Sequence, residues 1–215
     1  MKNIHKTLLF VLVSALLSCQ PDDATKDYGF AKVYIPQATV TGLDNSYPIP
    51  LGPFYQNSVY TCRYDKGSGK LSIALGVVRS AYLSEQKAFS VNLGYSQAET
   101  DRKLAEYAAK GVSAEALSPS VCTIPGNIQV EAGTNGGTCY VDVDMKALAG
   151  QRASLFTPDG YKLLVLGLEI TNPTQYELAD NYTSVVIVLD LGSEHWDQVP
   201  ADKPESEIRQ LFPTI

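Results

Sequence analysis

Apolar and polar residues alternate along much of this 215-residue chain, and this period of two constrains its fold more than any other feature. Successive side chains of a β-strand point to opposite faces, so the pattern predicts strands with one buried face. The alternating segments are residues 31–35, 71–77, 89–95, 128–130 and 141–145. The last two flank Gly133-Thr134-Asn135-Gly136-Gly137, a turn sequence that predicts a hairpin.

Two denser apolar runs, 161–171 and 183–191, are typical of strands that are covered on both faces near the centre of a sheet. Strands separated by turn-rich loops favour two packed sheets over a helix bundle or a βαβ fold. The sequence therefore predicts an all-β fold, an immunoglobulin-like antiparallel β-sandwich over residues 30–192. Residues 193–215 are rich in proline and charge, and we expect a C-terminal tail there with a short helix at 205–211.

One segment, residues 97–110, departs from the period of two. It places apolar side chains among charged ones and stops at Gly111, which predicts an amphipathic helix inserted in the sandwich. Ser96 can cap this helix, and Glu99 stands three residues later, as in a capping box.

The first twenty residues have the order of a secretory signal. Lys2 and Lys6 precede an apolar run at 7–17 that is too short to span a bilayer, which needs about 20 apolar residues. Ser18 then leads into Cys19, an arrangement that resembles the bacterial lipobox. The resemblance implies that residues 1–18 are removed as a signal peptide and that acyl chains on Cys19 anchor the protein to a membrane.

The segment after Cys19, which we assign as a lipidated tether over residues 19–29, begins Gln20-Pro21-Asp22-Asp23. This acidic start resembles the export signal of surface lipoproteins of Bacteroidota. It implies an outer-membrane protein, lipid-anchored and facing outward. The alternative is a plain flexible tether that leaves the protein on the periplasmic face.

Charge and residue inventory exclude several functions. Without Lys2 and Lys6 the mature chain has 15 basic and 23 acidic residues, a net charge of −8, which argues against nucleic-acid binding. Once His5 leaves with the signal, His195 is the one histidine, and it lies in the tail. The chain has no HExxH or CxxC motif and no phosphate-binding glycine loop, so we expect no metal, no cofactor and no enzymatic activity.

Three cysteines remain after Cys19, an odd number for an oxidising compartment. Cys122 and Cys139 flank the predicted hairpin and are the candidate disulfide pair, with Cys62 left over. The alternative, which we favour, is three buried free thiols, since a free cysteine behaves as a small apolar residue.

Short strand-like motifs along the chain carry a family resemblance. In order they are residues 33–38, 117–120, 128–133, 141–144, 161–166 and 186–191. This order resembles the β-sandwich domain of unknown function at the N-terminus of many Bacteroidota surface lipoproteins, over about residues 30–192. The resemblance implies an accessory role in glycan binding or polysaccharide utilisation, with a polysaccharide and neighbouring surface lipoproteins as partners. It supplies no catalytic motif.

Aromatic residues are the remaining indication of binding, because sugar rings stack on Tyr and Trp. The candidate glycan-binding residues are Trp196, Tyr161, Tyr176 and Tyr182. The alternative is that these rings pack the rim of the core. At the level of function, the alternative to glycan binding is a structural or adhesive, fimbria-like surface protein without a sugar site.

A third candidate function is glycoside hydrolysis, which needs two carboxylates facing each other across the sugar. Asp142 and Asp144 share one face of a predicted strand and could contact a sugar or Ca²⁺. The favoured interpretation is a solvated sheet face, so the residues disfavour a glycosidase.

Overall fold

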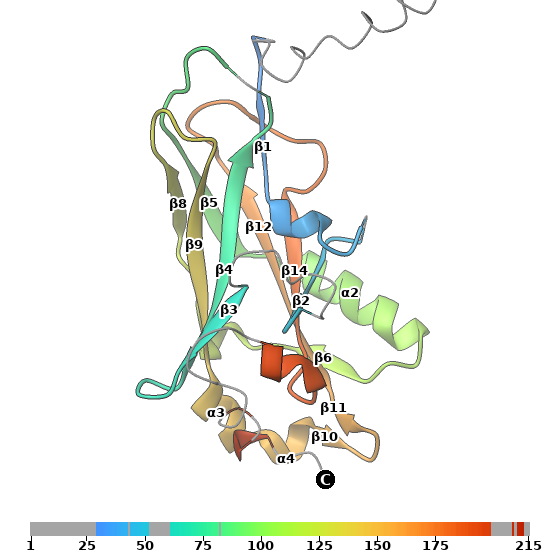
Figure 1. Ribbon diagram of the computed structural model, residues 1–215. Coiled ribbons are helices and arrows are strands. Elements are labelled where there is room, and N and C mark those ends of the chain that lie inside the picture. Colours follow the sequence, from blue (N-terminus) through green and yellow to red (C-terminus); the bar gives the residue numbers. More distant parts are fainter. Residues whose placement is uncertain are drawn as a thin grey trace, which may run out of the picture.

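The alternating segments form strands of two sheets that pack face to face (Figure 1). The computed structural model describes residues 29–42, 44–51, 61–81, 83–198, 208 and 210–212. In the first sheet the strand order is β13 (Glu177–Leu178), β1 (Lys32–Tyr34), β4 (Lys70–Arg79), β9 (Gly136–Asp144) and β7 (Cys122–Thr123), with β3 (Cys62–Asp65) also on β4. In the second it is β2 (Ser46–Ile49), β14 (Ser184–Leu189), β12 (Leu163–Thr171), β5 (Phe89–Tyr95) and β8 (Asn127–Val130), with β6 (Ala114–Ala116) beside β12.

The core lies between the sheets and follows the period of two. Leu71, Ile73, Leu75 and Val77 of β4 have no exposed surface, and β9 contributes residues such as Val141 from the next strand. Each such side chain stabilises the fold by about 1.5–3 kcal/mol relative to an exposed position. The prediction of a β-sandwich is confirmed.

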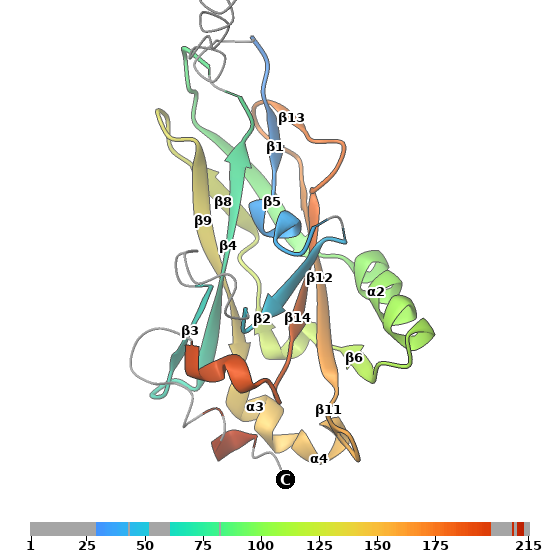
Figure 2. The same cartoon turned by 45° about the vertical axis from the view of Figure 1, so that its right-hand side comes forward.

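The two denser apolar runs are the central strands β12 and β14 of the second sheet. Their inner faces join the main core, and on the outer face Val165, Val186 and Val188 pack beneath Leu104 and Tyr107 of helix α2 (Gln97–Ala109). Figure 2 shows α2 alongside this sheet. The runs are apolar on both sides because a sheet covers one face and a helix the other.

The predicted capping box is wrong, although the helix begins where it was expected. Ser96 stands at the N-cap, but its side chain makes no capping hydrogen bond. Instead, the Thr100 hydroxyl donates to the Ser96 carbonyl at 2.9 Å and accepts from the Gly167 N–H at 2.8 Å. The start of α2 is therefore held by the sheet below it.

Two features of the sandwich were not expected. Three pairings are parallel, β1 with β13, β2 with β14 and β6 with β12. In addition to α2, the described chain forms short helices: η2 (Pro36–Thr39), η4 (Pro119–Val121), α3 (Met145–Gly150), α4 (Arg152–Leu155) and η5 (Glu194–Gln198). Helix α3 starts directly after β9 because the Asp144 carboxylate accepts a hydrogen bond from the Ala147 N–H at 2.9 Å.

The C-terminal segment was predicted to be a tail outside the core, and this prediction is wrong for its described part. Trp196, Ile208 and Phe212 are fully buried and belong to the main core. Residues 208, 210 and 211 are helical, within the range expected for a short helix. A tail of mixed composition can cover the end of a sandwich with its few large apolar side chains.

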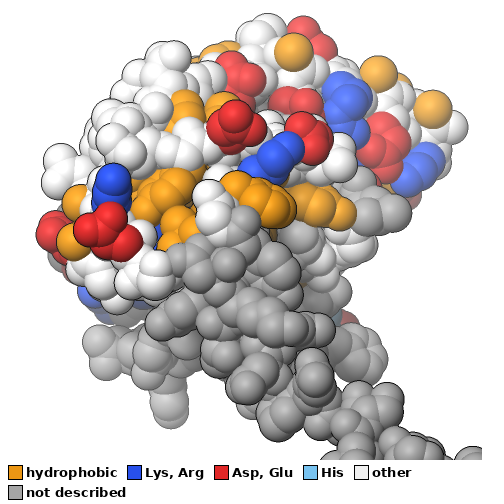
Figure 3. All heavy atoms as spheres, turned by 90° about the horizontal axis from the view of Figure 1, so that it is seen from above, with side chains coloured by type: hydrophobic (Ala, Val, Ile, Leu, Met, Phe, Trp, Pro, Cys, Tyr) orange, Lys and Arg blue, Asp and Glu red, His pale blue; other side chains and the backbone are white. Residues whose placement is uncertain are grey.

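Charge is mixed on the described surface. Seen from the end where β1 begins, acidic and basic side chains lie interspersed (Figure 3). No helix among the described residues is both long enough and apolar enough to cross a membrane.

Candidate functional site

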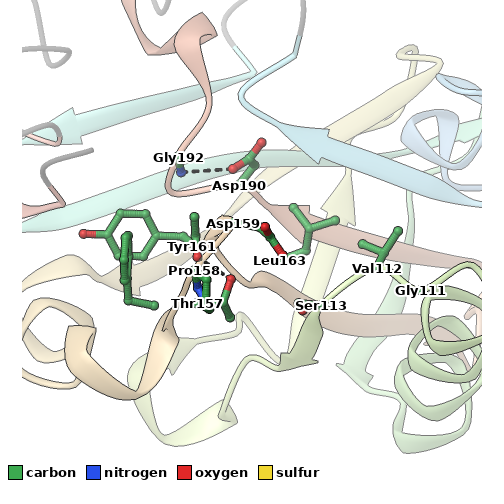
Figure 4. A pocket seen from close by; sticks show the side chains of 12 residues that line it. Gly111, Val112, Ser113, Thr157, Pro158, Asp159, Tyr161, Leu163, Asp190 and Gly192 are labelled. Carbon is green, nitrogen blue, oxygen red and sulfur yellow. Dashed lines mark hydrogen bonds between the residues drawn. The ribbon is translucent and has the colours of Figure 1, made fainter. Parts of the chain in front are cut away.

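Figure 4 draws the lining of a cleft of about 790 Å³. The hairpin at residues 156–161 that forms part of this lining lies toward the end of the sandwich remote from the start of β1 (Figure 1). The cleft is lined by residues 111–113 after α2, by the hairpin of β10 (Phe156–Thr157) and β11 (Gly160–Tyr161), by Leu163, and by Asp190 and Gly192 after β14. The volume lies within the range of small-ligand sites, about 300–1,000 Å³.

The β10–β11 hairpin forms one wall of the cleft. Its register pairs Phe156 with Tyr161, and the Thr157 hydroxyl donates to the Gly160 carbonyl at 2.8 Å. Gly160 has a φ of 118°, a left-handed conformation that favours glycine and that closes the Pro158–Gly160 turn.

The ring of Tyr161 is held by two edge-to-face contacts. Its centroid lies 5.1 Å from that of Phe156 and 5.7 Å from that of Phe212. The buried Phe212 therefore connects the C-terminal segment to the aromatic wall. This packing restricts the ring, which lowers the entropic cost of presenting it to a ligand.

Asp190 follows the last strand of the sandwich and lines the cleft, with its carboxylate directed toward Gly192 (Figure 4). Its carboxylate accepts a hydrogen bond from the Gly192 N–H at 3.0 Å, and its backbone carbonyl accepts one from the indole N–H of Trp196 at 3.0 Å. Burial raises the pKa of the Asp190 carboxyl above its usual value, partly opposed by the Gly192 N–H and by His195. Asp159, at the tip of the hairpin turn, is an exposed second carboxylate.

Of the four predicted aromatic binding residues, only Tyr161 lines the cleft. Trp196 is fully buried and offers no face to a sugar, which corrects that prediction. Tyr182 is half-buried against the main core, and Tyr176 accepts hydrogen bonds through its hydroxyl from Arg79 Nη1 at 3.1 Å and from the Lys87 N–H at 3.0 Å. The buried Trp196 is structural, as the alternative interpretation held, and Tyr176 and Tyr182 are half-buried rings outside the cleft lining.

The candidate disulfide does not form in this fold, and Cys62, Cys122 and Cys139 are free thiols. Cys122 pairs with Val143 in the β7–β9 register, so Cys139 lies four positions further along β9, roughly 13 Å at about 3.4 Å per residue. A disulfide needs Cα atoms within about 7 Å. Burial raises the pKa of Cys122 and of Cys139 to about 11 and that of Cys62 to about 12.

The strand carboxylates of β9 have structural partners. Asp142 accepts a hydrogen bond from the Ser72 hydroxyl at 2.6 Å and lies 3.6 Å from the Lys70 ammonium, while Asp144 caps α3. Among the described residues no three His, Cys, Asp or Glu side chains gather as a metal site. The lipidation residue Cys19 and its tether up to residue 28 lie outside the described part of the chain.

The sequence interpretation missed most of the cleft. Asp190, Asp159 and residues 111–113 were not singled out, although Pro158-Asp159-Gly160 is a recognisable turn sequence. Tyr140, which the cleft does not include, is 49% exposed on the outer face of the first sheet, with the Arg63 guanidinium carbon 5.6 Å from its ring centroid.

No family model and no curated protein matches the chain. Among solved structures it is similar to a protein of unknown function from Bacteroides ovatus, with 15% identity, a TM-score of 0.49 and 74% of this chain covered. It is similar to a multidomain protein including DUF1735 from the same species, with 12% identity, a TM-score of 0.45 and 74% covered. It is also similar to an auxiliary nutrient binding protein from Bacteroides thetaiotaomicron, with 15% identity, a TM-score of 0.42 and 69% of this chain covered.

The matched region spans less than half of each of these proteins, 46%, 43% and 45% of their chains respectively. All three are Bacteroides proteins. At these identities and scores the similarities assign no function to the chain.

Proposed function

We propose that this chain is a lipid-anchored accessory protein of the outer surface that binds glycan in the cleft and does not cleave it. The observation that carries the proposal is that Tyr161 and Asp190, which are 29 positions apart in the sequence, line one cleft.

The two groups match the two kinds of surface on a sugar. The C–H face of a pyranose ring packs on an aromatic ring, and its hydroxyls donate to a carboxylate. Phe156 and Phe212 hold Tyr161, and the Gly192 N–H holds Asp190. Few convergent polar groups in a partly apolar concavity are the usual composition of a small-ligand site.

The position of the cleft supports a surface role. The described chain begins at Gly29, three residues before β1. Strand β1 starts at one end of the molecule, and the β10–β11 hairpin of the cleft lies toward the other (Figure 1). A protein tethered through residues before Gly29 can present such a cleft away from the membrane.

The alternative, a structural or adhesive subunit, would need an edge strand that accepts a donor strand. The outer strands of the first sheet, β13 and β7, are two residues long, and those of the second, β2 and β8, are four residues long. Strands this short are poor acceptors of a donor strand, which disfavours strand exchange at these four outer strands.

Binding is tested with residues 20–215 by affinity gel electrophoresis over a panel of polysaccharides, followed by calorimetry on any that retain the protein. We expect retention by at least one polysaccharide, and at least a tenfold weaker Kd for Tyr161→Ala and for Asp190→Asn. Tyr140→Ala, which removes an exposed tyrosine outside the cleft, is the matched control and should bind like the parent chain.

Circular dichroism and thermal unfolding establish that each variant is folded. Absence of retention on every polysaccharide would overturn the proposal, as would loss of binding in Tyr140→Ala with Tyr161→Ala unaffected. Release of reducing ends from a bound polysaccharide would overturn its non-enzymatic part.

A further inference from the structure

We infer that the cleft selects neutral glycans and rejects glycans that carry carboxylate or sulfate groups. This inference rests on the proposed function and names the substrate class of the same site. The observation behind it is the sign of the charge on the lining. Asp159 and Asp190 contribute two carboxylates, and the described residues that line the cleft include no Lys, Arg or His.

Two cationic side chains near the cleft must be considered. His195, five positions after Asp190, acts on its carboxyl but is not among the described lining residues. Lys162, the cation closest in sequence to the β10–β11 hairpin, is already paired. Lys162 lies between Tyr161 and Leu163, but its ammonium contacts Glu115 Oε2 at 2.8 Å and donates to the Ser154 carbonyl at 2.8 Å. A carboxylate or sulfate is recognised in proteins through Arg, Lys or converging N–H donors. The described lining offers such a ligand two carboxylates and no cationic side chain.

A neutral sugar suits the same lining. Each hydroxyl is a donor as well as an acceptor, so it can donate to Asp159 or Asp190. The net charge of the chain, −6 over the full sequence, adds a long-range repulsion of polyanions that salt screens.

The test compares each neutral polysaccharide that binds with its own C6-carboxylated form, in which primary hydroxyls have been oxidised to carboxylates. Polygalacturonate and chondroitin sulfate serve as independent anionic probes. We expect Kd for every anionic probe to be at least tenfold weaker at 10 mM NaCl, and the difference to narrow at 150 mM NaCl.

Charge variants separate the cleft from the bulk charge of the protein. Asp159→Asn should bind the C6-carboxylated form several-fold more tightly than the parent chain does, and Asp159→Lys more tightly again. Glu169→Gln makes the same change of net charge at an exposed position of β12 outside the cleft, so it should leave the discrimination unchanged.

Three outcomes decide the matter. Anionic probes that bind as tightly as neutral ones, or more tightly, overturn the inference while glycan binding stands. Equal effects of Asp159→Asn and Glu169→Gln also overturn it, because the discrimination would then come from net charge alone. If neither class of polysaccharide binds, the proposed function fails and the inference falls with it.

Discussion

At the scale of single residues, Lys103 is a buried charge that needs partners, because its side chain is only 1% exposed. Its ammonium lies 3.1 Å from Asp44 Oδ2 and 3.0 Å from Glu106 Oε2, and 5.1 Å from the centroid of the Tyr107 ring. Two carboxylates and an aromatic face replace the water that burial removes. This group ties α2 to the segment that precedes β2.

The pKa of the Asp44 carboxyl depends on these contacts with Lys103 and on its neighbours. Burial acts to raise it, but hydrogen bonds from Thr41, Ser46 and Lys103 outweigh burial and hold the pKa of the Asp44 carboxyl well below its usual range. A group whose pKa is lower in the folded chain stabilises the fold fully above its unfolded pKa, about 3.9 for Asp. That stabilisation is lost as the pH falls from there toward the folded value.

Asp44→Asn should therefore lower the free energy of unfolding at pH 7 by about 1 kcal/mol, a modest loss because the Asp44 side chain is 44% exposed. The gap between parent and variant should shrink at pH 3, where the unfolded parent chain gains a proton. Urea unfolding at both values measures it, with Glu169→Gln as the exposed-carboxylate control. A gap that stays constant or widens toward pH 3 would contradict this reading of Asp44.

At the scale of elements, α2 rests on the sheet through the absence of a side chain. A Cβ placed on Gly167 would lie 2.6 Å from the Ser96 carbonyl oxygen and 2.7 Å from the Thr100 backbone nitrogen. At this close approach the Ser96 N–H donates to the Gly167 carbonyl at 2.9 Å, and the Gly167 N–H donates to the Thr100 hydroxyl at 2.8 Å.

Gly167→Ala should destabilise the protein by about 1–3 kcal/mol, since the helix must move off the sheet to admit the methyl group. Gly94→Ala in the adjacent strand β5 is the matched control, because a Cβ there meets nothing within 4 Å, and its effect should stay within about 0.5 kcal/mol. Chemical denaturation compares the two. Equal effects would show that the approach of α2 to β12 does not limit the packing.

A second prediction at this scale concerns the C-terminal segment, which closes the end of the core. Phe212→Ala should cost about 3–5 kcal/mol because Phe212 is fully buried and packs on Tyr161. Gln210→Ala, two residues earlier and exposed, should change stability by less than about 0.5 kcal/mol. Thermal and urea unfolding of both variants measure these changes in stability. A loss of stability in Phe212→Ala as small as that in Gln210→Ala would show that the C-terminal segment contributes little to the core.

The elements also show where local reasoning held. The strands at 71–77 and 89–95 and the helix at 97–110 were predictable because strand and helix periods are read within a few residues. The short strands β7, β10 and β11 carry two residues each, too few for any period. Two of the three form the wall of the cleft, so the site lay where the periodic signal was weakest.

At the scale of the whole molecule, the proposed lipid anchor on Cys19 would determine where the cleft is presented. Several acyl chains on Cys19, each buried CH₂ contributing about 0.8 kcal/mol, would hold the protein at a membrane. Cys19→Ala should yield an unlipidated protein that is either soluble or retains its signal peptide. Detergent-phase partitioning and mass spectrometry of the expressed protein measure this. A Cys19→Ala protein that is processed and still partitions into detergent would contradict the lipid anchor.

By itself, the sequence determined which face of each long strand is buried, where the helix lies and that the fold is a β-sandwich, because side-chain periodicity is a local property of the backbone. Only the tertiary structure decided that Trp196 and Phe212 are part of the core, that Cys122 and Cys139 are too far apart to pair, and that Tyr161 and Asp190 line one cleft. Those outcomes depend on which distant segments come together, and that is set by the packing of the whole chain.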